Sequence, residues 1–344
     1  MGVRADLRRG SAGEAVRDLQ RRLSALGFDS TGDPSGTFGT ATETAVREFQ
    51  TARGLKVDGA CGGGTWAAIV ESGWTFGDRL LYFRIPVQRG DDVAELQRRL
   101  NALGFDAGRE DGLFGPETAD ALREFQRAVG LADDGICGRT TVAALDRLGA
   151  TVAGAEGSVA QVREREDLLH DLRGIRGRGI YVAAAPGFEA LADRVTRGLV
   201  TVGARALLDA AGRSESDMAA AANQFEADLL VALGPGDRPG CRCAYFESGR
   251  FRSETGYRVA TAITKEIGRV LEKTEAPCGR SYAVLRETRM AAVNCELAGP
   301  DDVAGLREVV SHGGAVANAI VIGARRGFDP PPNPTETITV KPRI

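Results

Sequence analysis

Few residues in this sequence could bind a metal ion or act as a nucleophile. It contains two histidines, His170 and His312, and six cysteines. A zinc ion that activates water takes three protein ligands and keeps a fourth position open. Two histidines therefore do not complete a histidine-based hydrolytic site. Four cysteines fall in the second half of the chain, at Cys241, Cys243, Cys278 and Cys295.

These four cysteines leave two interpretations open. Thiolates bind zinc well, so a structural zinc site or a redox-active pair could use them. Their spacing is Cys-x-Cys followed by two separate cysteines, which departs from the paired Cys-x2-Cys pattern of common zinc sites. We expect semi-buried thiols without a cofactor, and zinc is the alternative.

The C-terminal segment 329–344 carries a run of hydroxyl side chains. Residues 329–334 read Asp-Pro-Pro-Pro-Asn-Pro, a composition that excludes a helix. Thr335, Thr337 and Thr339 follow at alternate positions. We expect an exposed, extended and flexible tail, of the kind found at many chain ends.

The composition restricts the class of protein. A length of 344 residues allows two or three domains, and 43% hydrophobic with 26% charged residues is an ordinary globular balance. A net charge of −3 gives no basic field for nucleic acid. No apolar run approaches the roughly 20 residues of a membrane span, and no signal peptide is visible at the first residues. We therefore expect a cytoplasmic protein with reduced thiols.

The first half of the chain is a duplication. Residues 19–29, LQRRLSALGFD, return as residues 96–106, LQRRLNALGFD, and the Phe-Gly, Phe-Gln and Asp-Gly-x-x-Gly elements follow in the same order in both copies. Apolar residues at helical spacing predict three short helices in each copy, with glycines at caps and turns. We place the copies at residues 4–73 and 84–149 and interpret their recurring positions as core and turn residues.

The second half of the chain has a different hydrophobic pattern. Residues 150–177 are interpreted as a linker with a charged helix. From residue 178 to 328, short apolar runs alternate with amphipathic segments, which predicts an α/β domain with a mostly parallel sheet. Strands are expected at 180–185, 228–233 and 291–296, and a further strand at 282–285. A single final helix is expected at 306–323.

The duplicated unit resembles the peptidoglycan-binding domain found on cell-wall hydrolases. The Leu-Gln, Phe-Gly, Phe-Gln and Asp-Gly-x-x-Gly elements carry the resemblance in both copies. It implies two small all-α domains of three helices. It also implies peptidoglycan fragments, or a lipid-linked precursor, as ligands.

The α/β region resembles the zinc-dependent N-acetylmuramoyl-L-alanine amidases. In that family one histidine follows the Pro-Gly turn after the first strand, where this sequence has Phe188. A second histidine ends the strand after the Ala-Asn motif, where this sequence has Gly234. Glu189 is the nearest candidate for the helix glutamate, in poor register, and Glu296 matches the catalytic glutamate. Because Phe and Gly side chains donate no lone pair, we interpret the domain as a degenerate amidase with a vestigial Glu296.

The whole arrangement resembles the cytoplasmic amidase-like regulators of actinobacteria. That resemblance implies phosphorylation of Thr335, Thr337 or Thr339 by a Ser/Thr kinase. It also implies a UDP-N-acetylglucosamine enolpyruvyl transferase and a forkhead-associated domain protein as partners. Two alternatives stay open: an active zinc amidase that cleaves between N-acetylmuramic acid and L-alanine, and a sensor that binds muropeptides or lipid II. A location at the inner membrane face, through partners, is compatible with each regulatory hypothesis.

Overall fold

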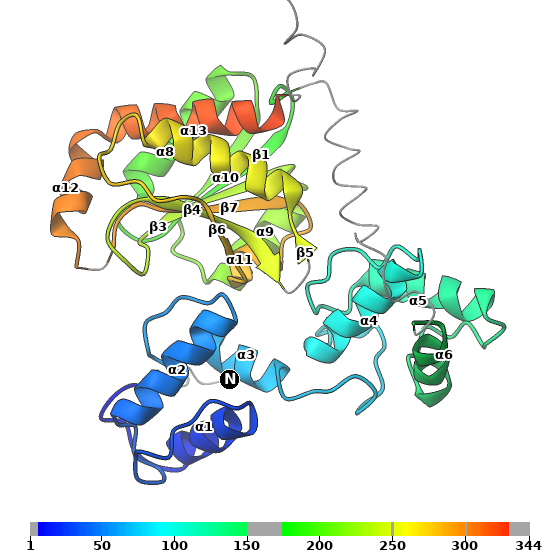
Figure 1. Ribbon diagram of the computed structural model, residues 1–344. Helices are drawn as coiled ribbons and strands as arrows, with labels where there is room; N and C mark the ends of the chain where they lie inside the picture. Colours follow the sequence, from blue (N-terminus) through cyan, green and yellow to red (C-terminus); the bar gives the residue numbers. More distant parts are fainter. Residues whose placement is uncertain (1–5, 150–173, 249–250, 300, 330–344) are drawn as a thin grey trace, which may run out of the picture.

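The computed structural model describes residues 6–149, 174–248, 251–299 and 301–329. Residues 150–173 of the predicted linker and the three tail threonines lie outside this range. Within it, two helical repeats precede one α/β domain (Figure 1). No helix among the described residues combines the length and the apolar character needed to cross a membrane.

Each repeat consists of three helices, as predicted. Repeat 1 contains α1 (Glu14–Ala25), α2 (Thr40–Ala52) and α3 (Gly63–Glu71). Repeat 2 contains α4 (Asp91–Ala102), α5 (Pro116–Ala128) and α6 (Arg139–Gly149). The apolar residues of the duplicated motifs form one small core per repeat, around Phe49 in the first and Phe125 in the second.

Buried glutamines of the duplicated motifs hold the loops of each repeat in place. Gln20 is buried, and its amide group donates to the Thr37 carbonyl at 3.0 Å and accepts from the Gly36 amide at 2.8 Å. Gln97 makes the equivalent bonds to Leu113 and Gly112 in repeat 2. Buried side-chain amides that are fully hydrogen-bonded fix loops that have little apolar surface of their own.

The α/β domain is built on a sheet with strand order β2-β1-β3-β7-β4-β5, and β6 pairs with β4. The strands β1, β2, β3 and β7 run parallel, and β4 runs antiparallel to β7. The predicted mostly parallel sheet is therefore confirmed. The strands are β1 (Gly179–Ala184), β2 (Arg205–Asp209), β3 (Leu229–Gly234), β4 (Arg242–Ser248), β5 (Phe251–Arg252), β6 (Cys278–Arg280) and β7 (Ala291–Glu296).

Helices cover both faces of this sheet (Figure 1). One face packs against α8 (Glu189–Thr201), α10 (Glu254–Ile267) and α13 (Gly313–Phe328). The other face packs against α9 (Glu215–Gln224) and α11 (Ala283–Arg286). Both β1 and β3 are buried along their whole length, because helices cover both of their faces.

Both repeats contact the side of the α/β domain that carries α11 (Figure 1). Arg286 pairs with Glu71 of repeat 1 at 2.7 Å, and the neighbouring Glu287 pairs with Arg89 of repeat 2. Arg109 of repeat 2 donates to the Thr288 carbonyl at 2.7 Å and lies over the ring of Phe246. These ion pairs and hydrogen bonds join the three units.

Two local expectations were wrong. The apolar run 282–285 was predicted as a strand, but Ala283–Arg286 forms the short helix α11. A run of four apolar residues fits either structure, and here the carboxylate of Glu215 accepts from the amides that begin the helix. The predicted final helix is divided at His312 into α12 (Val303–Ser311) and α13, because the chain turns there before two glycines.

Helices α10 and α13 can pack closely because Gly323 has no side chain where they cross. A Cβ atom at Gly323 would lie 2.4 Å from the Cα atom of Ile263. We expect Gly323→Ala to lower the free energy of unfolding by about 1–3 kcal/mol, since overpacking forces the helices apart. Gly313→Ala in the same helix is the control, because a Cβ atom there meets nothing within 4 Å. Equal urea unfolding midpoints for the two variants would contradict this account of the crossing.

Candidate functional site

The carboxyl ends of the parallel strands bring the predicted site residues together. Gly234 ends β3 and is the register partner of Glu296 at the end of β7. The chain leaving β1 is tied to β3, because the Ala185 amide donates to the Leu233 carbonyl at 2.8 Å. Phe188 follows, and its amide donates to the Ala185 carbonyl at 3.0 Å. This edge is where α/β folds commonly bind ligands.

Two of these positions offer no ligand atom. Phe188 is buried and packs with the apolar core beneath α8. Gly234 is buried too, and the space beside it is taken by the Ala185 side chain, 3.1 Å from where a Cβ atom would lie. A benzyl group and a hydrogen cannot coordinate a metal ion, so these residues do not fit the zinc site of a hydrolytic amidase.

Glu189 does not supply the ligand atoms that Phe188 and Gly234 lack. It is exposed, and its two carboxylate oxygens accept from the Gly187 amide at 3.0 and 2.9 Å. A hydrogen bond from its own main-chain amide and then that from Gly187 lower the pKa of the Glu189 carboxyl. The residue therefore stabilises the turn before α8.

Glu296 lies in a buried network of charges. Its Oε2 accepts from Arg242 Nε at 2.5 Å and its Oε1 accepts from the Tyr282 hydroxyl at 2.6 Å. Only 3% of the Glu296 side chain and 5% of the Arg242 side chain are exposed. Each carboxylate oxygen therefore already accepts a hydrogen bond from a fixed donor, which is a poor arrangement for a general base.

The electrostatics of the network favour a neutral tyrosine hydroxyl and a charged arginine. Burial and then the charge of Glu296 raise the pKa of the Tyr282 hydroxyl, so it remains a donor. Burial lowers the pKa of Arg242, but the charge and hydrogen bond of Glu296, together with the charge of Asp237, turn the net shift upward. Arg242 also forms a close ion pair with the buried side chain of Asp237. The guanidinium is thus shared between two buried carboxylates, and the more exposed Glu275 lies 3.6 Å from it.

A small cavity of about 160 Å³ lies at this edge and is named the edge cavity. Glu296, Tyr282 and Gly234 line it, together with Glu215 from α9 and Lys56 from repeat 1. Burial raises the pKa of the Glu215 carboxyl, and the charge of Lys56 acts in the opposite direction. A cavity of this size falls below the roughly 300 Å³ at which ligand pockets begin.

Repeat 1 is fixed beside the edge cavity by main-chain contacts. The Ser281 amide donates to the Gly54 carbonyl at 3.0 Å. The Val57 amide donates to Asp237 at 3.4 Å, which links repeat 1 to the charged network. Repeat 1 therefore supplies part of the cavity wall.

Comparison with known proteins agrees with this architecture. The peptidoglycan binding domain family matches residues 12–69 and 89–145, which correspond to the two repeats. The chain is 34% identical over 334 residues to N-acetylmuramoyl-L-alanine amidase CwlM of Mycobacterium tuberculosis. That match covers 85% of this chain and 81% of the relative. The chain belongs to the CwlM family.

Other relatives share parts of this architecture. N-acetylmuramoyl-L-alanine amidase CwlL of Bacillus licheniformis is 32% identical over 163 residues, which is 41% of this chain and 45% of CwlL. The chain thus matches less than half of that amidase. The solved N-acetylmuramoyl-L-alanine amidase AmiC2 of Nostoc punctiforme is 18% identical with a TM-score of 0.36, over 43% of this chain and 96% of AmiC2.

The four cysteines considered as zinc ligands in this CwlM-family chain do not lie in one group. Cys241, Cys243 and Cys295 pack into the core beneath α10 and α13, and Cys278 packs against the opposite face of the sheet. Cys243 and Cys295 are register partners with their Sγ atoms 3.6 Å apart. The hydrogen bond with the Cys243 thiol and then burial raise the pKa of Cys295, which favours the protonated thiol. Among the described residues, no cluster of three or more His, Cys, Asp or Glu side chains could hold a metal ion.

Sequence reasoning missed the partners of Glu296. Arg242 lies between two cysteines in a strand that is otherwise largely apolar, and a charge in that position was the available signal. Asp237 and Tyr282 gave no such signal in the sequence. Their contacts with the network are made only in the folded chain. Lys56 is one of only four lysines in the sequence, but its place beside the edge cavity depends on the docking of repeat 1.

The buried network predicts a large loss of stability when its cation is removed. We expect Arg242→Met to lower the free energy of unfolding by about 3–5 kcal/mol, because Glu296 would remain buried without its cation and Asp237 would keep only the longer contacts to Arg238 and Arg280, at 3.8 and 3.9 Å. Arg238→Met is the matched control, since Arg238 is 56% exposed and lies 3.8 Å from the same Asp237; its effect should stay below about 1 kcal/mol. Chemical denaturation compares the two variants, and similar losses would refute the special role of Arg242.

Proposed function

We propose that this chain is a non-catalytic regulator of peptidoglycan precursor synthesis. The proposal rests on the residues at the carboxyl ends of the parallel strands, beside the edge cavity. Phe188 and Gly234 stand where an amidase of this kind needs histidine ligands, and both oxygens of Glu296 accept from Arg242 and Tyr282. The fold of an amidase is retained while the groups for hydrolysis are missing, a common separation of fold and function.

The regulated step in this proposal is the UDP-N-acetylglucosamine enolpyruvyl transferase reaction. Membership of the CwlM family and the resemblance to cytoplasmic amidase-like regulators support that choice. The switch would be phosphorylation of Thr335, Thr337 or Thr339 by a Ser/Thr kinase. A phosphate adds about −1.5 to −2 charges and three acceptor oxygens that an arginine-lined partner can bind. A forkhead-associated domain protein is proposed as a further partner, and the location as cytoplasmic, at the inner membrane face through partners.

The regulatory proposal predicts a dependence on the tail. We expect the phosphorylated full chain to raise the turnover of the enolpyruvyl transferase, and the unphosphorylated chain to leave it near its basal rate. A variant with Thr335, Thr337 and Thr339 all changed to Ala should not activate after kinase treatment. Restoring one threonine at a time identifies the modified residue. Turnover that does not change on addition of phosphorylated protein would overturn the proposal.

An active zinc amidase is the competing function, and it predicts the opposite biochemistry. We expect no release of L-alanine-headed peptides from purified peptidoglycan, and no difference between the parent chain and Glu296→Gln. We also propose that the chain carries no zinc cofactor, so plasma mass spectrometry of protein purified without chelator should give less than stoichiometric zinc. Peptide release that Glu296→Gln abolishes, or one zinc per chain, would restore the amidase hypothesis.

A second function, the sensing of wall peptides or lipid-linked precursor, is compatible with regulation. The two peptidoglycan-binding repeats favour it. We propose peptidoglycan fragments as ligands of this chain. The edge cavity is too small for such a ligand, so a sensing site would lie elsewhere in the molecule.

A further inference from the structure

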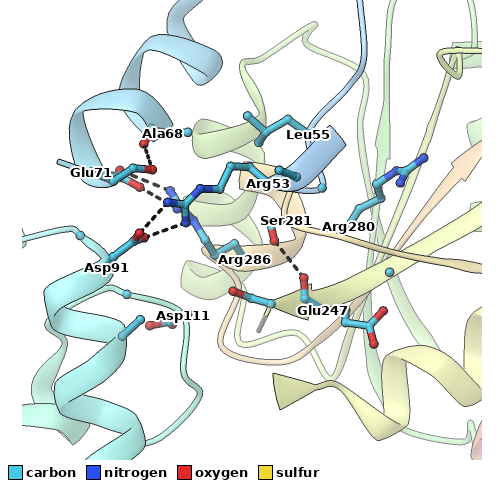
Figure 2. A pocket seen from close by; sticks show the side chains of 18 of the residues that line it. Arg53, Leu55, Ala68, Glu71, Asp91, Asp111, Glu247, Arg280, Ser281 and Arg286 are labelled. Atoms are coloured by element: carbon cyan, nitrogen blue, oxygen red, sulfur yellow. Dashed lines mark hydrogen bonds and ion pairs between the residues drawn. The ribbon is translucent and has the colours of Figure 1, made fainter. Parts of the chain in front are cut away.

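The two sides of the sheet in the α/β domain are covered differently. On the side of α11 the repeats dock through ion pairs such as Arg286 with Glu71, which line the cavity between the units (Figure 2). At the other end of the sheet lies β2, which pairs with β1 and with no further strand among the described residues. An open strand edge exposes main-chain donors and acceptors, and native proteins usually cover such edges or keep them short.

The register of β2 identifies the groups that point outward. The Arg205 amide donates to the Arg178 carbonyl at 2.8 Å, and successive residues of a strand turn their main-chain groups alternately to one neighbour and to the other. The main chain of Arg205 and Leu207 therefore faces β1, and that of Ala206 and Leu208 faces the open edge. The Leu207 residue is 44% exposed. The edge thus offers two amides, two carbonyls and an apolar contact to an added strand.

The last described residues lie next to this edge. The guanidinium of Arg178 lies over the ring of Phe328, the last residue of α13, at 4.3 Å from its centre. The carbonyl of the same Arg178 accepts from the first amide of β2. Arg258 holds the following residue, since it donates to the Asp329 carbonyl at 2.6 Å. Residues 330–344 therefore leave the domain at the amino ends of β1 and β2.

The segment 330–334 is long enough to reach the open edge. Neighbouring strands lie about 4.8 Å apart, so a strand added beyond β2 lies about 10 Å from β1. Residues 330–334 read Pro-Pro-Pro-Asn-Pro, and an extended proline-rich segment of this length spans about 15 Å. A strand that starts at residue 335 can therefore begin at the amino end of β2.

Such a connection has the hand that the fold already uses. The unit β1–α8–β2 crosses the face of the sheet that carries α8 and moves toward the β2 edge. A connection from β7 through α13 to the tail crosses the same face in the same direction. Crossovers between parallel strands of one sheet are almost always of one hand. A tail strand parallel to β2 therefore satisfies this rule.

The tail sequence suits this position. Residues 335–340 read Thr-Glu-Thr-Ile-Thr-Val, and all except Glu336 are β-branched, the residue type most enriched in strands. One parallel register places Glu336 opposite Arg205 and Ile338 opposite Leu207. Side chains that lie opposite each other share a face of the sheet, so this register joins opposite charges and covers the exposed leucine.

We propose that residues 335–340 bind along the open edge of β2 as an additional parallel strand, in the register that pairs Glu336 with Arg205. This differs from the free tail expected from the composition. The strand would hold Thr337 and Thr339 against β2, so docking would compete with any enzyme that modifies them. The proposal goes beyond regulation of the transferase and does not depend on it, because strand pairing requires neither a phosphate nor a partner protein.

The register also determines which tail amides would be used. The main chain of Ala206 and Leu208 faces the tail, so the main chain of Ile338 faces back between them. The Ile338 amide would donate to the Ala206 carbonyl, and the Ile338 carbonyl would accept from the Leu208 amide. The amide of Thr339 would point away from β2 into solvent. Proline at these two neighbouring positions therefore has different expected effects.

The test is amide hydrogen exchange of the full chain, followed at single residues by NMR. We expect the Ala206 and Leu208 amides to exchange at least about tenfold faster when residues 330–344 are removed, the change expected if the tail is docked for about nine-tenths of the time. The Leu207 amide is the internal reference. It faces β1 in both chains, so its exchange rate should change little.

Two variants of the full chain separate strand pairing from a general effect of the tail. Ile338→Pro removes an amide that faces β2 and should accelerate exchange at Ala206 and Leu208 as the deletion does. Thr339→Pro is the matched control, because an edge strand tolerates proline where the missing amide faces solvent; its exchange rates should equal those of the parent chain.

Three outcomes would overturn the proposal. The first is equal exchange at Ala206 and Leu208 in the parent chain and in the shortened chain. The second is equal acceleration by Ile338→Pro and Thr339→Pro. The third is protection that depends on protein concentration and not on the tail, which would assign the edge to a second copy of the chain.

Discussion

The buried guanidinium of Arg242 organises the structure around the candidate site. It donates to Glu296 at the end of β7 and forms a close ion pair with Asp237 in the loop after β3. Removing such a charge from water is expensive, and the cost is offset only when its donors meet well-placed acceptors. The ends of β3, β4 and β7 therefore have little freedom to move apart. In this way one cation fixes the position of Glu296 in the wall of the edge cavity.

The same network reaches the neighbouring repeat. Asp237 accepts from the Val57 amide of repeat 1, and Glu296 accepts from Tyr282, which precedes α11. Through Arg286, α11 is in turn paired with Glu71 at the end of α3. Repeat 1 is thus connected to Glu296 through a short chain of polar contacts.

Local sequence signals predicted the parts of the fold that depend on local physics. The strands β1 and β3 are continuous apolar runs because both faces of the sheet are covered, and the repeats were visible through their duplicated cores. The helix α11 was missed because Glu215, distant in sequence, caps the amides at its start. The strand β4 was missed: it begins at the charged Arg242, and the partners that make that charge tolerable come from outside the strand. The absence of a ligand atom on the side chains of Phe188 and Gly234 can be read from the sequence, whereas the hydrogen bonds of Glu296 with Arg242 and Tyr282 cannot.

The duplication separates the residues that build a repeat from those that dock it. The pairs Gln20 and Gln97, and Gln50 and Gln126, make equivalent bonds in both copies, because each copy needs them to hold its loops. The residues that face the α/β domain have no such counterparts: Lys56 corresponds to Ala132, and Glu71 to Arg147. Arg109, which donates to Thr288 and lies over Phe246, likewise belongs to one copy alone. Two copies with one fold have thus acquired different surfaces, and Lys56 places repeat 1 alone at the edge cavity.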